Sequence, residues 1–286
     1  MSLPGRLLDL DGVRVFVHRS GTGTGAPLVL IHGFMMSHWA WRRVVPLLTA
    51  AGHEVVALDL PGFGESDRPT RREFRYDAQA YVRTIVRVLD ALAIERATLV
   101  GHSMGAGIAI VAAANNPERV ARLVLADPLA YAARISLEER AVLAPIVGPA
   151  LFDALLTKRR MQRFMRRMTY HDPSVASDEW IDYLWERVRR PGGIEAALAA
   201  LAFVADASDV QRALSAISAP TLIVWGENDR IFPVRYAERL AREIPHAELC
   251  LVPSCGHSPP EERPEDFARA VLQFLAADAP PRRATA

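Results

Sequence analysis

The sequence contains only two cysteines among its 286 residues, Cys250 and Cys255. Two cysteines cannot build a disulfide framework or a four-ligand zinc site, although one local bridge between them is sterically conceivable. A reduced, cytoplasmic setting is therefore expected. An excess of one charge is also absent, because 34 lysines and arginines face 33 aspartates and glutamates. The resulting net charge of +1 argues against nucleic acid as a partner.

Long hydrophobic runs are missing as well. The most apolar stretch, 97–114, is broken by Gly101, His102 and Ser103, so it does not reach the about 20 uninterrupted apolar residues that a membrane helix needs. The chain is nevertheless 50% hydrophobic, which is enough for a large core. We expect a globular protein with no membrane span that acts on a small molecule; the sequence leaves its oligomeric state open.

Short apolar runs alternate with segments of helical periodicity along most of the chain, and this alternation predicts a mainly parallel sheet covered on both faces. The first two runs are too close together for a helical crossover and predict an antiparallel hairpin. Eight strands are expected, at 6–10, 13–17, 28–31, 55–58, 97–100, 123–125, 221–224 and 249–252. Helices are expected at 78–92, 104–115 and 237–244.

Strand signals vanish between about residues 129 and 215, where helical, arginine-rich sequence takes over. We interpret 129–215 as a helical cap inserted into a core made of 1–128 and 216–278. The tail, 279–286, is expected to be disordered.

Two features of this cap have alternative interpretations. The segment 158–168 predicts a helix with Met161, Phe164, Met165 and Met168 as a buried stripe, and its basic face is either solvated or guides an anionic substrate. The aromatic residues Trp180, Tyr183 and Trp185 are either part of the cap core or pocket walls.

The strongest local pattern is Gly101-His102-Ser103-Met104-Gly105, which lies directly between a predicted strand and a predicted helix. This is the nucleophile-elbow pattern in its required context. A sharp turn there exposes the Ser103 hydroxyl, and the flanking glycines relieve crowding between strand and helix. The start of the helix directs its N–H groups at the reaction centre, where they favour a developing oxyanion.

A serine hydroxyl needs an adjacent base, which predicts a histidine farther along the chain. His257 follows the last predicted strand and is the best candidate. The imidazole in turn needs a carboxylate. Asp229, in the turn after the strand at 221–224, fits best because the order Ser, Asp, His is the one that this pattern uses. Asp127, after the neighbouring strand, and Glu227 remain as rivals.

A second donor for the oxyanion is expected from the loop His32-Gly33-Phe34-Met35, which follows the strand at 28–31. Gly33 lets the chain turn and leaves the Phe34 N–H free. Together with the N–H of Met104 it is predicted to form the oxyanion hole.

These segments, with Asp59-Leu60-Pro61-Gly62-Phe63-Gly64-Glu65-Ser66 and Gly226-Glu227-Asn228-Asp229, closely resemble the capped α/β-hydrolase superfamily. The resemblance covers about residues 8–275 and implies an α/β-hydrolase fold, with an eight-stranded, mostly parallel sheet, flanking helices and a cap. It also implies a Ser103–His257–Asp229 triad, Phe34 and Met104 as oxyanion hole, a structural Asp59, and neither cofactor nor metal.

Differences from related subfamilies narrow the expected reaction. Haloalkane dehalogenases and epoxide hydrolases carry aspartate where this chain has Ser103. Meta-cleavage C–C hydrolases share the Ser-Met-Gly elbow, but usually follow His-Gly with a Gly-Pro-Gly-type loop that Phe34-Met35-Met36 does not match. The resemblance therefore implies hydrolysis of a small or medium apolar carboxylic ester, thioester or lactone through an acyl-enzyme. The alternatives are a C–C hydrolase or lyase with the same triad and, with less support, a non-catalytic small-molecule receptor.

Overall fold

The computed structural model describes residues 3–131, 141–144 and 148–277. The predicted disordered tail and two short stretches of the predicted cap lie outside these residues. Both cysteines are free thiols, so the conceivable bridge between them is not formed. In the part of the chain that is described, no helix combines the length and apolar character needed to cross a bilayer.

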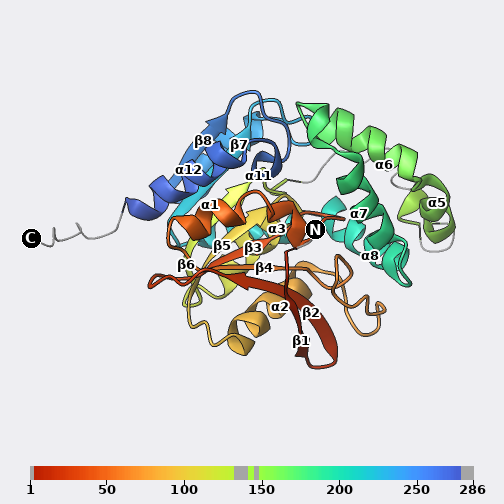
Figure 1. Cartoon of the computed structure of the whole chain (residues 1–286), viewed down its shortest axis with the longest axis horizontal. Coiled ribbons are helices and arrows are strands. Elements are labelled where there is room, and N and C mark those ends of the chain that lie inside the picture. Colours follow the sequence, from red (N-terminus) through yellow and green to blue (C-terminus); the bar gives the residue numbers. More distant parts are fainter. Residues whose placement is uncertain (1–2, 132–140, 145–147, 278–286) are drawn as a thin grey trace, which may run out of the picture.

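An eight-stranded sheet forms the centre of the molecule (Figure 1). Its order is β1-β2-β4-β3-β5-β6-β7-β8, and β2 runs antiparallel to both neighbours while the other pairings are parallel. This confirms the α/β-hydrolase fold and the N-terminal hairpin. The strands are β1 Arg6–Leu10, β2 Val13–Ser20, β3 Leu28–Ile31, β4 Val55–Leu58, β5 Ala97–His102, β6 Val120–Ala126, β7 Thr221–Gly226 and β8 Ala247–Val252.

Alternate residues of the central strands face two separate hydrophobic layers, because successive side chains of a strand point to opposite faces. In β3, Leu28 and Leu30 pack with helices α1 (Val45–Ala50) and α12 (Pro264–Ala276). Val29 and Ile31 belong to the layer on the other face, which also contains buried residues of α2 (Ala78–Ala91), α3 (Met104–Asn115) and α10 (Arg235–Glu243). This double cover explains why the strands read as continuous apolar runs.

Of the helices between β6 and β7, those from α5 to α8 form a group at one end of the molecule in Figure 1. We call residues 141–144 and 148–216 the inserted segment. Its helix α9 contacts α3 of the core, so this group is not cleanly divided from the sheet layers. Its helices are α5 Gly148–Leu155, α6 Lys158–Phe164, the π-helix η2 Met165–Thr169, η3 Pro173–Val175, α7 Asp178–Val188, α8 Gly193–Ala205, α9 Ser208–Ala213 and η4 Leu214–Ala216. The predicted domain limits remain predictions.

The buried stripe predicted for 158–168 is only half right. Met161 and Met165 are buried against the aromatic core of the inserted segment, whereas Phe164 is 52% and Met168 37% exposed. The helix changes from α to π after Phe164, which interrupts the 3.6-residue period that the prediction assumed. Trp180 belongs to this core and is fully buried, as the core interpretation predicted.

Candidate active site

Ser103 lies between the end of β5 and the start of α3, as the elbow pattern predicts. Its φ of 52° is in the left-handed region, a strained conformation for a residue with a Cβ. Backbone hydrogen bonds hold it there: its N–H donates to the carbonyl of Ala126 over 2.9 Å. A Cβ on Gly105 would come within 2.3 Å of the Ile31 carbonyl oxygen, which explains the glycine beside the elbow.

His257 reaches this serine from the loop after β8. Its Nε2 is 2.9 Å from the Ser103 Oγ, and its ring is almost completely buried. Two hydrogen bonds fix its backbone. The His257 N–H donates to the Thr169 carbonyl over 2.7 Å, and its own carbonyl accepts from His102 Nε2 over 2.7 Å. Burial lowers the pKa of His102 to about 3, with a smaller contribution from the neighbouring His257, so His102 is a neutral donor.

Asp229 completes a continuous chain of contacts. Its Oδ2 lies 2.7 Å from His257 Nδ1, while its Oδ1 accepts the N–H groups of Ile231 and Phe232 over 2.7 and 2.9 Å. Burial alone would raise the pKa of Asp229, but the His257 ring and these N–H donors lower it overall. A carboxylate that stays ionised next to Nδ1 favours the tautomer in which Nε2 can accept the serine proton.

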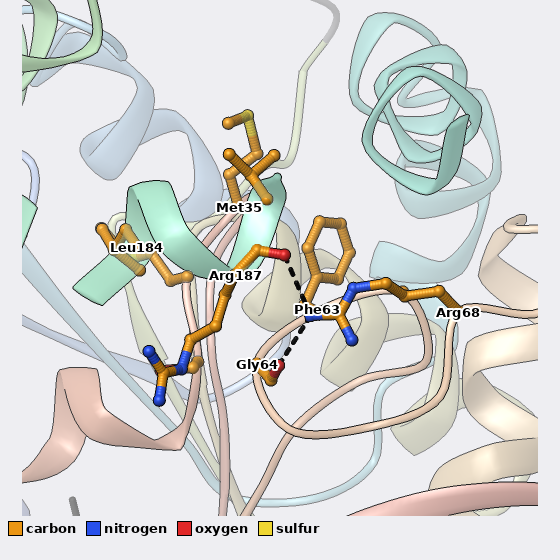
Figure 2. Close-up of a pocket in the computed structure, with 10 residues that line it drawn as sticks. Met35, Phe63, Gly64, Arg68, Leu184 and Arg187 are labelled. Carbon is orange, nitrogen blue, oxygen red and sulfur yellow. Dashed lines mark hydrogen bonds between the residues drawn. The ribbon is translucent and has the colours of Figure 1, made fainter. Parts of the chain in front are cut away.

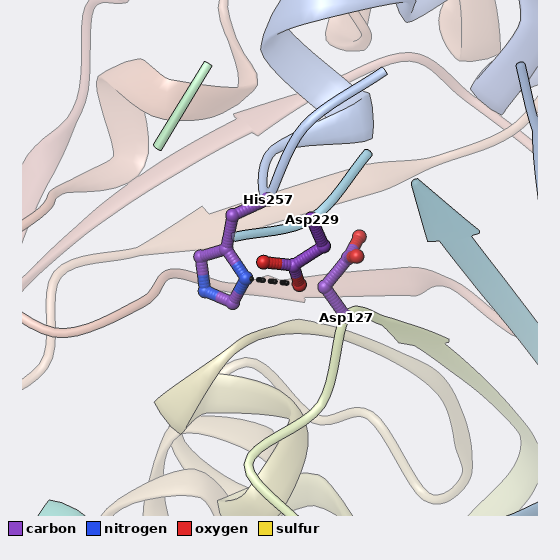
Figure 3. Close-up of side chains that lie close together, drawn as sticks. All are labelled: Asp127, Asp229 and His257. Atoms are coloured by element: carbon purple, nitrogen blue, oxygen red, sulfur yellow. Dashed lines mark hydrogen bonds and ion pairs between the residues drawn. The ribbon is translucent and has the colours of Figure 1, made fainter. Parts of the chain in front are cut away.

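The two rival carboxylates differ from each other. Glu227 is exposed to solvent, and within the described ranges its carboxylate makes no hydrogen bond or ion pair, although its backbone N–H donates to the Val252 carbonyl over 3.1 Å. Asp127 is fully buried beside Asp229 (Figure 3). One carboxylate oxygen of each aspartate and one ring nitrogen of His257 all lie within 4.8 Å of one another. The direct contact to His257 is made by Asp229, and Asp127 is an additional buried acid whose presence the triad alone does not explain.

The predicted oxyanion loop lies against the elbow. A Cβ built on Gly33 would approach the Ser103 Cβ to 3.3 Å, so this loop and the serine are in contact range. His32 joins the loop to the next one, donating from Nδ1 to the Gly33 carbonyl and accepting the Leu60 N–H at Nε2. Neither Phe34 N–H nor Met104 N–H has an acceptor among the described residues. Both donors are therefore available, and the oxyanion hole remains a proposal.

Asp59 has a structural environment, as the resemblance implied. It is fully buried, and its carboxylate accepts the N–H groups of His38 and Glu65 over 2.5 and 2.7 Å and contacts His38 Nδ1 at 2.9 Å. Burial would raise its pKa, but these hydrogen bonds lower it overall. Asp59 thus ties together the loops that follow β3 and β4.

Residues that support the His257 loop were not foreseen from the sequence. Besides His102 and the Thr169 carbonyl, Glu262 accepts the N–H of Gly256 at 3.2 Å and that of His171 at 2.9 Å. These contacts connect residues up to 155 positions apart. The only sequence signal was His102 within the elbow pattern, whose hydrogen bond to the distant His257 loop the pattern does not indicate.

A small pocket opens between α7 and the loops after β3 and β4 (Figure 2). Arg68 donates to the carbonyls of Gly64 and Arg187, so its guanidinium joins core and inserted segment. The pocket is lined by Met35, Met36, Ser37, Gly62, Phe63, Gly64, Arg68, Leu184, Arg187 and Val188. Because Met35 follows Phe34 directly, the inserted segment shapes space next to the predicted oxyanion loop.

Comparison with known proteins agrees with this architecture. The sequence model of a family described as "alpha/beta hydrolase fold" matches residues 26–264. The chain is 31% identical to an uncharacterised hydrolase, YugF, of Bacillus subtilis, covering 95% of this chain and 98% of that one. It is 35% identical to a 2-hydroxymuconate semialdehyde hydrolase of Pseudomonas sp. CF600, covering 95% and 94%.

Among solved structures, a variant of the meta-cleavage product hydrolase CumD of Pseudomonas fluorescens superimposes with a TM-score of 0.79. The two sequences are 28% identical, and the match covers 95% of this chain and 97% of that one. With the family model spanning most of the sequence and the same sheet in the structure, this chain belongs to the α/β-hydrolase family.

Proposed function

We propose that this chain is a serine hydrolase that cleaves a carbon–carbon bond next to a carbonyl group in a small conjugated acid. Ser103 is the nucleophile, His257 the general base and then acid, and Asp229 the group that orients the imidazole. The carrying observation is the unbroken contact from Ser103 to Asp229, present in a chain related over nearly its full length to a 2-hydroxymuconate semialdehyde hydrolase. The sequence alone favours ester hydrolysis, whereas the similarity to these relatives supports carbon–carbon bond hydrolysis.

The first step suits any carbonyl substrate. Ser103 Oγ attacks the carbonyl carbon, its proton passes to His257 Nε2, and the carbonyl electron pair moves onto oxygen. The amides of Phe34 and Met104 stabilise this oxyanion. In the 2-oxo tautomer of such a substrate, the leaving carbon is saturated and lies next to a C=C bond that is conjugated with the 2-oxo group. When the carbon–carbon bond breaks and the carbonyl reforms, the electron pair passes along this system to the 2-oxo oxygen, and the resulting dienolate takes the proton from His257. Water then releases the acyl group from Ser103.

Ester hydrolysis is the second candidate, favoured by the loop Phe34-Met35-Met36. This loop lacks the Gly-Pro-Gly-type sequence usual in the C–C hydrolases that the chain resembles. The same residues would act in the same order, except that an alkoxide takes the proton from His257. A single oxyanion donor is typically worth about 3–4 kcal/mol of transition-state stabilisation, so the conformation of this loop matters for either reaction.

The test is product analysis with matched substrates. The purified chain is incubated with 2-hydroxymuconate semialdehyde, whose hydrolysis consumes one water and yields formate and 2-hydroxypenta-2,4-dienoate, and separately with p-nitrophenyl esters, thioesters and lactones. We expect formate and 2-hydroxypenta-2,4-dienoate to form with a kcat/KM above that for any ester. If an ester is turned over faster and 2-hydroxymuconate semialdehyde is left intact, ester hydrolysis replaces the proposed reaction.

The Ser103→Ala variant is the control for the nucleophile. We expect it to lose about four or more decades of turnover while keeping the wild-type circular dichroism spectrum. A fluorophosphonate should label the wild-type chain and not this variant. Tight binding of a small molecule without labelling or turnover would instead identify a receptor.

A further inference from the structure

The buried acid Asp127 has an unusual environment at the end of β6. Its Oδ1 accepts the Gly226 N–H over 3.0 Å, but its Oδ2 has no hydrogen-bond partner within the described residues although it is buried. Its φ of 41° is a further departure from relaxed backbone. Figure 3 shows its carboxyl group beside that of Asp229, on the side away from the His257 ring. A position that keeps both strain and a buried unsatisfied oxygen needs an explanation.

Two buried carboxyl groups this close cannot both be ionised at low cost, so the pair retains a proton near neutral pH. Asp229 accepts two backbone N–H groups and contacts His257, whereas Asp127 accepts one N–H. The ionised form is therefore better solvated at Asp229, and the proton belongs on Asp127. Burial, followed by the negative charge of Asp229, raises the pKa of Asp127 well above its usual range.

Other titratable groups near Asp127 favour the same assignment. Glu262 adds negative charge on one side. The Cys255 thiol lies nearby and stays neutral, because burial raises its pKa. His102, whose ring centroid is 5.2 Å from that of His257, is neutral and contributes no cation. His257 is thus the sole group in this surrounding set that gains positive charge during the proposed reaction.

We propose that Asp127 is a positioning residue that remains protonated and donates its Oδ2 hydrogen to the Asp229 carboxylate. This inference rests on the proposed function, because it concerns how Asp229 acts on His257. The donated hydrogen bond spreads the charge of Asp229 and fixes the carboxylate against the imidazole. A less concentrated charge on Asp229 attracts the imidazolium less strongly, and loss of the donated hydrogen bond would strengthen that attraction.

The closing experiment compares two variants of Asp127 by the pH dependence of kcat/KM. Asp127→Asn mimics the protonated acid, since its carbonyl oxygen can accept the Gly226 N–H and its amide can donate to Asp229. Asp127→Ala removes the donor. For Asp127→Asn, we expect the acidic limb of the profile to stay within about 0.3 pH unit of wild type. For Asp127→Ala, we expect it to move up by about one pH unit. We expect kcat/KM to fall about tenfold in the Asp127→Ala variant and less than threefold in the Asp127→Asn variant.

Other profiles overturn the inference. If the acidic limb of the Asp127→Asn profile moves to lower pH, the substitution has removed a negative charge, and Asp127 was therefore ionised in the wild type. Unchanged limbs in both variants leave Asp127 with a purely structural role.

Thermal unfolding provides a measurement that does not depend on activity or on the Ala variant folding. A protonated Asp127 takes up a proton on folding above about pH 4, so wild-type stability falls as pH rises toward the raised folded pKa. The Asp127→Asn variant should therefore gain about 2 °C in Tm over wild type for each pH unit between pH 5 and neutral pH. A constant difference would refute the protonated state. Absence of wild-type hydrolysis would refute the proposed function while leaving this measurement decisive for Asp127.

Discussion

The sheet edge and the inserted segment hold His257 in different ways. The sheet provides the side chains around it: Ser103 after β5, Asp127 after β6 and Asp229 after β7. The inserted segment provides a backbone carbonyl, that of Thr169, and ion pairs at a distance from the ring. The residues of the proposed triad therefore follow the ends of parallel strands, while the inserted segment contacts the histidine loop and lines the neighbouring pocket.

This division predicts its largest effect on the sheet side, in Asp229→Asn. An amide at this position can donate to Nδ1 and so stabilise the wrong imidazole tautomer, which should lower kcat by about 10⁴-fold with the fold intact. Glu227→Gln, two residues earlier and exposed, is the matched control and should retain wild-type kinetics. Steady-state kinetics at pH 7.5 checks both variants. If Asp229→Asn lost less than tenfold, the dominant role of Asp229 would be wrong.

The same division explains which features the sequence could predict. Ser103, His257 and Asp229 each follow a strand whose apolar run is evident, and parallel strands bring their carboxyl ends to one edge. The eight strands were predictable for this reason, with ends that differ by a few residues. Asp127 was recognised only as a rival to Asp229, because no sequence pattern indicates that two carboxyl groups share one site.

Contacts of the inserted segment were not predictable from the chain. The hydrogen bond from His257 to Thr169 depends on how helices pack across the sheet edge, and periodicity carries no information on such pairings. The prediction of a regular helix over 158–168 missed the π-helix at 165–169 for a related reason. Its local sequence suits a regular helix, and the 3.6-residue period alone gives no sign of where the turn widens.

A second prediction concerns the boundary between the two regions, at Tyr170. Its hydroxyl donates to Glu261 Oε2 over 2.7 Å and accepts from Trp180 Nε1 over 3.0 Å, and all three residues are fully buried. Tyr170→Phe leaves a carboxylate oxygen and an indole N–H with one partner fewer. We expect the free energy of unfolding to fall by about 1–3 kcal/mol in a chemical denaturation experiment.

Tyr131→Phe is the control for this loss. The Tyr131 hydroxyl donates to Glu243 over 2.8 Å, but the Glu243 side chain is 35% exposed, so water can replace the hydrogen bond. Its cost should be below about 1 kcal/mol. If the free energy of unfolding falls equally in the two variants, the buried contact between the core and the inserted segment stabilises the fold no more than an exposed one.

The smallest effect is expected where the inserted segment is held by charge. Arg187 and Arg190 of the α7 region both donate to Glu65 in the loop after β4, over 2.8 and 2.6 Å. Glu65→Gln weakens both contacts without changing size. These groups are partly exposed, and such pairs contribute little to overall stability. We therefore expect KM to rise by about two- to fivefold through looser closure of the pocket, with kcat nearly unchanged.

The pH dependence of this effect has a definite sign. Partial burial would raise the pKa of Glu65, but hydrogen bonds from Arg190 and Arg187 lower it overall. A carboxylate with a lowered folded pKa stabilises the folded state above its unfolded pKa, and this contribution is lost as pH falls through the folded value. The Tm difference between wild type and Glu65→Gln should therefore be constant above about pH 5 and shrink below about pH 4.5. A Tm difference that does not shrink as pH falls below about 4.5 would show that Glu65 holds the inserted segment by shape and not by charge. The contrast between the side chains at the sheet edge and the charged contacts of the inserted segment would then need revision.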